Sequence, residues 1–249
     1  MKKTIFLDKK IQVLIVSAGG VGTTFLMREI EKYKTTNCSS NTDGYKHLPI
    51  PPISFNQNLK VIYIFGNPIL ASMSLFRRQY HHTQSIKVQE YLRADYTIPF
   101  SMSIEEYAKG AKDGFYFKLH FYHWYKQYPI YNTLFLKYET LSEQVEVIRD
   151  FLDLPLHFVH NFPPKIKRNS NFSNLSATTL GGLVQLYGSF EKEIQQLPSS
   201  MTQKGNYIIL LKNIFTRPYL QGLKKVLWRK VPLLRRVRNR LYKILLSEK

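Results

Sequence analysis

Three glycines and two threonines near the start of the chain have the types and spacing to hold an anion. They form the run Gly19-Gly20-Val21-Gly22-Thr23-Thr24, between an apolar stretch rich in β-branched residues and a stretch with helical spacing. Glycines let backbone N–H groups turn toward a phosphate. The N-terminus of the following helix is the positive end of the helix dipole and also attracts an anion. We therefore predict a strand, a phosphate-holding turn and a helix over residues 11–33. The alternative is a glycine turn between a core strand and a core helix.

This run departs from the ATP-binding form of such loops, G-x-x-x-x-G-K-[ST]. Ser17 stands at the first glycine position, and Thr23 stands where the lysine that reaches the outer phosphates of ATP should be. A loop without that lysine is poorly suited to ATP hydrolysis. It remains suited to a phosphate group that needs no metal, and we identify no metal site in the sequence.

Histidine is the side chain best suited to accept a proton near neutral pH. The candidates for such a general base are His47, in the segment Lys46-His47-Leu48-Pro49, and, in reserve, the pair His81-His82. The alternative for His47 is an ordinary loop histidine, since the chain has seven. His120 and His123 lie among aromatic residues, which favours packing or acceptor contact over metal binding.

Hydrophobic patterning predicts alternating strands and helices. We expect a surface loop over 35–44, an extended segment over 45–52, a mobile loop over 81–99, and a capping box at Ser103 and Glu106. The alternation favours a three-layer αβα fold with a mostly parallel sheet and ligands at the carboxyl ends of its strands. Strands are predicted over 11–16, 60–65 and 133–138, and helices over 24–33, 68–80, 115–127, 142–152 and 178–197.

Composition is consistent with one substantial core. The 249 residues are 44% hydrophobic, and we assign residues 1–200 to an α/β domain and 201–249 to a basic helical tail. The single cysteine, Cys38, excludes an internal disulfide and suits a reducing, cytoplasmic setting. No run approaches 18 consecutive apolar residues, so we predict no transmembrane helix.

The predicted tail carries most of the excess positive charge. Of the 36 Lys and Arg residues, 13 lie after residue 200, against one of the 17 acids. Leucines recur at helical spacing over 219–249 with basic residues on the other faces, which predicts peripheral contact with an anionic membrane surface. Packing on the core or on a second chain is the alternative. Nucleic acid is disfavoured because aromatic residues do not interleave with the basic ones.

Residues 11–198 together resemble the sulfotransferases that use 3′-phosphoadenosine 5′-phosphosulfate (PAPS). The segment 22–24 matches the Gly-Thr-Thr of the family's 5′-phosphosulfate loop, and 46–49 resembles the segment with its catalytic histidine. The stretch 60–78 resembles the strand–turn–helix that holds the 3′-phosphate, with Ser74 at the family's phosphate-binding serine. Leu134–Pro155 is similar to the strand and helix before the C-terminal cofactor loop, which 167–170 resembles.

The resemblance implies transfer of a sulfonate from PAPS to a hydroxyl of a carbohydrate, a lipid or a small alcohol, without a metal. Catalysis is expected from His47, which takes the acceptor proton, and from Lys46. The residues implied in PAPS binding are Gly19, Gly20, Val21, Gly22, Thr23, Thr24, Ser74, Arg77, Arg78 and Arg168.

Two positions differ from the family pattern. Gly20 stands where the family has a lysine that bridges the sulfonate and the leaving phosphate oxygen, and Gly66 stands where it has an arginine. Each change removes a positive charge where the donor is negative, and Lys46, Arg77, Arg78 or Arg168 could supply it. The alternatives are a nucleotide-binding protein with weakened catalysis and a membrane or polyanion adaptor that acts through the tail.

Overall fold

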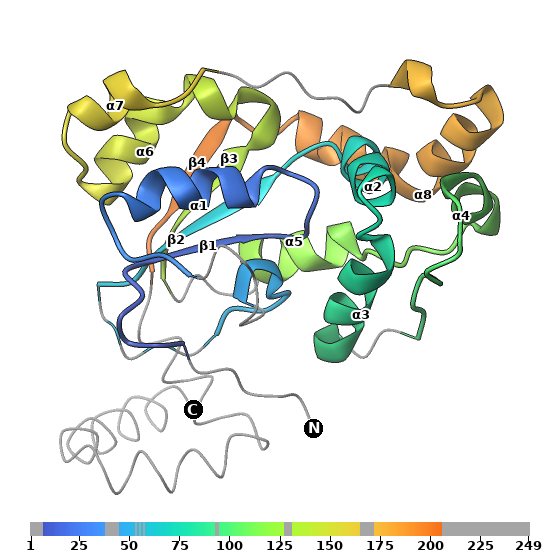
Figure 1. The fold of residues 1–249 in the computed structure, drawn as a ribbon, viewed down its shortest axis with the longest axis horizontal. Helices are drawn as coiled ribbons and strands as arrows, with labels where there is room; N and C mark the ends of the chain where they lie inside the picture. The colour runs from blue at the N-terminus through green and yellow to red at the C-terminus, as the bar shows by residue number, and fades with distance from the viewer. Residues whose placement is uncertain are drawn as a thin grey trace, which may run out of the picture. The chain divides into compact units, whose positions relative to one another are not determined.

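A computed structural model of the chain describes residues 7–37, 45–126 without 53, 55, 57, 93 and 94, 131–164 and 172–205. Figure 1 shows the order of the elements along the chain. Two predictions lie outside the described residues: the role of Arg168 and the basic helix over 219–249. None of the described helices is long and apolar enough to cross a membrane.

The centre of the fold is a sheet with the order β1-β2-β3-β4. Strands β1 (Val13–Ser17), β2 (Lys60–Phe65) and β3 (Asn132–Lys137) are parallel, and β4 (Ser200–Gln203) is antiparallel to β3. The three predicted strands are confirmed to within two residues. Strand β4 was not predicted, because its four residues have no apolar alternation.

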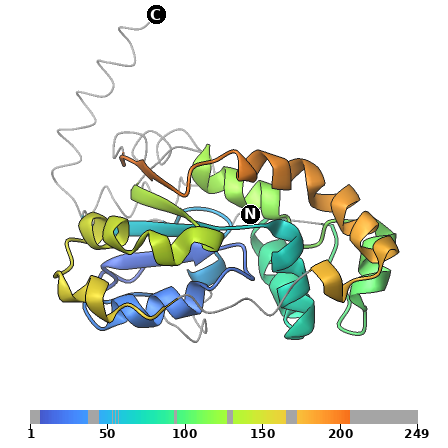
Figure 2. The same cartoon turned by 90° about the horizontal axis from the view of Figure 1, so that it is seen from above.

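Helices cover both faces of the sheet (Figure 2), which confirms the predicted three-layer arrangement. Helix α1 (Thr23–Glu31) lies on one side, and α5 (Phe117–Tyr125) and α8 (Ala177–Gln195) lie on the other. The side chains of β1 are buried on both faces, as expected of a covered parallel strand. Near β3 the chain forms the 3₁₀ helix η2 (Tyr138–Glu143), then α6 (Val145–Leu152) and α7 (His157–Asn161).

Helices α2 (Pro68–Arg77) and α3 (His81–Leu92) lie beside the carboxyl ends of β1 and β2 (Figure 1). Helix α2 begins where Asn67 accepts a hydrogen bond from the amide of Leu70 at 3.0 Å. The short helix α4 (Ile104–Gly110) begins at the predicted capping box, which is confirmed. The 3₁₀ helix η3 (Phe172–Asn174) precedes α8.

The predicted mobile loop over 81–99 is wrong for its first half, which forms α3. Its hydrophobic periodicity is weak because several of its buried positions are polar and form hydrogen bonds. The His82 ring donates to the carbonyl of Ile98 at 2.8 Å, and the Ser85 hydroxyl accepts from the amide of Ile98 at 3.0 Å. The predicted extended segment at 45–52 is also corrected, because it begins with the 3₁₀ helix η1 (Tyr45–His47). The helix expected over 142–152 is divided between η2 and α6.

A buried polar cluster joins α4, α8 and the loop between α4 and α5. The hydroxyls of Tyr107 and Tyr187 lie 2.5 Å apart, and Tyr187 donates to Asp113 Oδ1 at 2.8 Å. The same oxygen accepts the amides of Phe115 and Tyr116, each at 2.9 Å. Burial raises the pKa of the Asp113 carboxyl, while these hydrogen bonds act in the opposite direction. We refer to Tyr107, Asp113 and Tyr187 as the tyrosine–aspartate cluster.

Candidate functional site

The predicted phosphate-holding turn lies between β1 and α1. Its three glycines have φ values of +106° at Gly19, +75° at Gly20 and +68° at Gly22, which are left-handed conformations that favour glycine. Gly22 is the N-cap residue of α1, which begins at Thr23. The turn therefore directs the first amides of α1 toward the end of the sheet, where a helix start attracts anions.

Close packing also requires glycine in this turn. A Cβ atom at Gly20 would lie 2.6 Å from the carbonyl oxygen of Ala71 in α2. A Cβ atom at Gly22 would lie 2.5 Å from the Tyr138 ring. Because the first contact is with helix backbone, position 20 has no room for the lysine that the family pattern places there.

The hydroxyl groups of the turn have different partners. Thr23 is buried, and its hydroxyl lies 2.5 Å from that of Ser17, which also accepts the amide of Gly19 at 3.1 Å. Thr24 is half-buried, and its hydroxyl accepts a hydrogen bond from Lys46 Nζ at 3.0 Å. Ser17 and Thr23 thus stabilise the turn, whereas Thr24 connects it to the segment with the candidate base.

His47 lies beside the turn with a defined tautomer. Its Nδ1 is 2.9 Å from the carbonyl oxygen of Ser17. A carbonyl only accepts, so Nδ1 carries the proton and Nε2 keeps its lone pair. Burial lowers the pKa of His47 to about 3, with smaller contributions from the charges of Lys46 and Lys87, while the bond to Ser17 opposes the shift. His47 is therefore neutral at neutral pH, the state that a general base requires.

Helix α5 holds the segment with His47 through three consecutive carbonyl groups. His120 Nε2 lies 3.4 Å from the carbonyl oxygen of His47, Trp124 donates to that of Leu48 at 2.8 Å, and His123 Nδ1 lies 3.1 Å from that of Pro49. These contacts agree with the packing alternative for His120 and His123. On its other side, His120 Nδ1 is 2.8 Å from the hydroxyl of Tyr63.

A pocket of about 720 Å³ opens in front of the turn. No Asp or Glu occurs among its described lining residues, so its side-chain charge is positive. No group of three or more His, Cys, Asp and Glu residues that could hold a metal occurs among the described residues. The lining comprises the turn and the start of α1 over 20–25, Lys46 and His47, Leu75 and Arg78, and, near and within α3, Tyr80, Thr83, Gln84 and Lys87.

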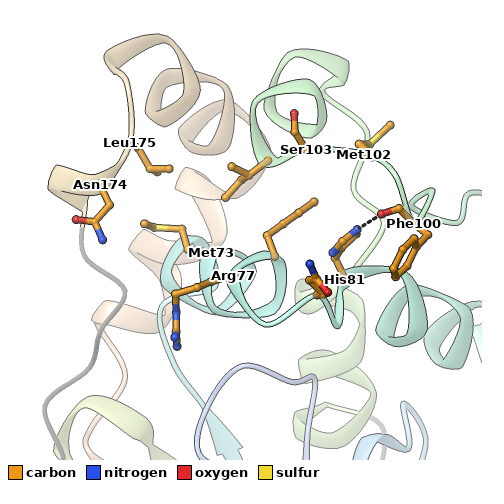
Figure 3. A pocket seen from close by; sticks show the side chains of 11 residues that line it. Met73, Arg77, His81, Phe100, Met102, Ser103, Asn174 and Leu175 are labelled. Atoms are coloured by element: carbon orange, nitrogen blue, oxygen red, sulfur yellow. Dashed lines mark hydrogen bonds between the residues drawn. The ribbon is translucent and has the colours of Figure 1, made fainter.

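The predicted phosphate ligands of α2 do not lie together. Arg78 lines this pocket, where its Nε donates to the carbonyl of Ser74 at 3.0 Å. Arg77 lines a second pocket of about 460 Å³ (Figure 3), together with Asn174 and His81. The Ser74 side chain is buried and lines neither of these two pockets.

The rings of the reserve histidines bond to the chain around residues 98–100. His81 stacks on Phe76 with ring centroids 4.4 Å apart, and its Nε2 donates to the carbonyl of Phe100 at 3.1 Å (Figure 3). His82 bonds to the chain near Ile98. Neither lines the pocket that contains His47.

Gln84 and Lys87 are among the lining residues of the pocket that the sequence interpretation did not select. Both come from α3, which was taken for a mobile loop. Gln84 is buried, and its Nε2 donates to the carbonyl of Ala18 at 2.9 Å. A polar residue at a buried helical position gives no hydrophobic signal, and only its contact with the turn identifies it.

A model of the sulfotransferase domain family matches residues 29–206. The chain belongs to the sulfotransferase family. The match includes His47, β2 and α2 and begins after the phosphate-holding turn. Among solved structures, the chain is similar to the mouse sulfotransferase SULT7A1 complexed with PAP, at 16% identity over 89% of this chain and 90% of that chain, with a TM-score of 0.39. Comparison with curated proteins gives no significant match.

Proposed function

We propose that this sulfotransferase takes its sulfonate from PAPS and transfers it to a hydroxyl group of a carbohydrate, a lipid or a small alcohol. One observation carries the proposal: the phosphate-holding turn, Lys46 and a neutral His47 line a single pocket without an acid among its described lining. A positive pocket next to backbone amides suits a donor with several negative charges. A neutral imidazole suits the removal of a hydroxyl proton.

The proposed reaction is an in-line displacement at sulfur. The acceptor oxygen forms a bond to sulfur while the bond from sulfur to the 5′-phosphate oxygen breaks. The electron pair of that bond stays on the phosphate, which leaves as adenosine 3′,5′-bisphosphate, and His47 Nε2 takes the hydroxyl proton. Nδ1 keeps its own proton and donates it in the hydrogen bond to the Ser17 carbonyl oxygen, so the ring is oriented before the acceptor arrives.

The two ends of the donor need different residues. The amides of residues 19–24 and the hydroxyl of Thr24 would hold the 5′ end, with Lys46 already hydrogen bonded to Thr24. The 3′-phosphate would bind at Ser74, with Arg77, Arg78 or Arg168 as its cations. Arg78 is the one of these that lines the described pocket.

Binding of adenosine 3′,5′-bisphosphate tests the donor. At a concentration one hundred times its Kd, the ligand should raise the free energy of unfolding of the full chain by about 2.7 kcal/mol. The melting temperature should rise accordingly. Ser74→Ala should reduce this shift. Ser72→Ala is the matched control, because the Ser72 hydroxyl bonds within α2 to the carbonyl of Ile69 at 2.7 Å. No shift at millimolar ligand would exclude PAPS as the donor.

A second candidate is a nucleotide-binding protein with little catalysis. The contact between Gly20 and Ala71 favours it, because that contact excludes the family's bridging lysine from position 20. Sulfonate transfer from PAPS to a panel of carbohydrate, lipid and small-alcohol acceptors separates the two candidates. Binding of the bisphosphate without transfer to any acceptor would select the second.

A further inference from the structure

We propose that Lys87 of α3 contacts the 5′-phosphosulfate end of the donor and supplies the positive charge that Gly20 cannot. This rests on the proposed use of PAPS. In this assignment the ammonium group of Lys87 stabilises the negative charge that develops on the leaving phosphate oxygen as the bond to sulfur breaks. The cation comes from a helix across the pocket instead of from the phosphate-holding turn.

Helix α3 is docked directly on the turn, which places Lys87 at the pocket. The amide nitrogen of the Gln84 side chain donates to the carbonyl of Ala18 at 2.9 Å. A Cβ atom at Gly19 would lie 3.1 Å from Cδ of Gln84, so the helix and the turn are in close contact. Lys87 follows Gln84 by three residues, which puts both on the same face of the helix. Lys87 accordingly lines the pocket together with residues 20–25.

The charge of Lys87 is not neutralised by the part of the chain that the structure describes. No hydrogen bond or ion pair of its ammonium group occurs among the described residues. The side chain is half-buried, and this burial lowers its pKa. Its charge is also one of the smaller causes that lower the pKa of His47. A partly desolvated cation acts on a nearby anion more strongly than one in water.

The other two cations in the described lining of the pocket make hydrogen bonds to protein groups. Lys46 donates to the hydroxyl of Thr24 at 3.0 Å. Arg78 donates to the carbonyl of Ser74, and its guanidinium carbon lies 5.4 Å from the centre of the Tyr80 ring. Arg77 lines the second pocket. Lys87 is therefore the cation of this described lining whose charged group makes no hydrogen bond to a described residue.

The test compares Lys87→Met with the wild-type chain and with Lys109→Met as the matched control. Lys109 is exposed on α4 and lines neither pocket. We expect Lys87→Met to lower kcat/KM for sulfonate transfer about 10²-fold, the size of effect seen when one group that stabilises developing negative charge is removed. Lys87→Arg should restore part of the rate, and Lys109→Met should change nothing.

Ligand binding gives a readout that does not depend on the acceptor. Lys87→Met should weaken binding of adenosine 3′,5′-bisphosphate about tenfold, the loss expected for one charged hydrogen bond, as measured by titration calorimetry. Binding of adenosine 3′-phosphate, which lacks the 5′ group, should be unchanged, because Lys87 acts at the 5′ end. Circular dichroism establishes that the variant is folded, and Lys87→Gln replaces it if Lys87→Met is not.

The outcomes separate this proposal from the proposed donor. A wild-type chain that does not bind the bisphosphate would overturn both. A wild-type chain that binds it, with equal affinity and equal rate in the Lys87 variants, would overturn only the assignment of Lys87. An equal loss of affinity for adenosine 3′-phosphate would also overturn it, because the effect would then not be local to the 5′ end.

Discussion

The pocket in front of the phosphate-holding turn and the tyrosine–aspartate cluster are both built from polar residues, but they use them differently. In the cluster, one carboxylate oxygen of Asp113 accepts three hydrogen bonds, and the hydroxyl of Tyr107 accepts the amide of Gly114 at 3.0 Å. The described lining of the pocket contains three cationic side chains, those of Lys46, Arg78 and Lys87, and no acidic one. Nε2 of His47 has no hydrogen bond partner among the described residues.

This difference indicates which polar groups stabilise the fold and which are available to a ligand. A buried polar group without a partner costs stability, so structural clusters satisfy their groups internally. A pocket whose described lining contains cations and no acid attracts an anionic ligand. Changes in the pocket should therefore affect activity more than stability, and changes in the cluster should do the reverse.

The largest effect should follow from His47→Asn. The Asn amide nitrogen can take the place of Nδ1 and keep the bond to the Ser17 carbonyl, but the side chain has no basic Nε2. We expect kcat for sulfonate transfer to fall about 10²–10⁴-fold, with the melting temperature little changed. A steady-state assay and a thermal scan measure the two quantities. Retention of more than half of the wild-type rate would contradict the role of His47.

The opposite result is expected for Asp113→Ala. The substitution leaves the amides of Phe115 and Tyr116 and the hydroxyl of Tyr187 without their acceptor in a buried site. We expect a loss of about 3 kcal/mol in the free energy of unfolding, measured in urea. Affinity for the bisphosphate should be unchanged under conditions where the variant is folded. A loss of affinity with full stability would contradict the separation between the two regions.

A smaller effect should appear on acidification. Burial lowers the pKa of His120, which lies behind His47, to about 3, below the 6.5 of an unfolded histidine. The unfolded chain then binds more protons between these values, so stability is lost as the pH falls from 6.5 toward 3. His120 alone should lower the free energy of unfolding by about 2 kcal/mol between pH 7 and pH 5.

Urea titrations at pH 7, 6 and 5 measure this slope. His120→Gln should make it shallower, whereas His160→Gln, on an exposed position of α7, should leave it unchanged. Asp113 has the opposite effect on the free energy of unfolding. Its pKa is raised in the folded state, so acidification through that pKa stabilises the fold. His120, behind His47, and Asp113, in the cluster, are thus distinguished by the direction in which acid changes their contribution to stability.

The sequence alone was sufficient to predict those features that depend on residues close together in the chain. Three apolar strands, the turn formed by the glycine run and the Ser103 capping box each depend on neighbouring residues, and the structure contains all of them. His47 was selected from a short segment, and the structure places it in the pocket of the turn. The roles of Ser74 and Arg168 remain predictions.

The tertiary structure decided what depends on packing between distant segments. The polar helix α3 is stabilised by hydrogen bonds to Ala18 and to the chain near Ile98, so its own sequence has little periodicity. Arg77 and Arg78 are neighbours in the chain, yet successive helical residues point in different directions, so they line different pockets. The tautomer of His47 follows from the carbonyl of Ser17, thirty residues away. Contacts of this kind have no local pattern, and only folding brings their partners together.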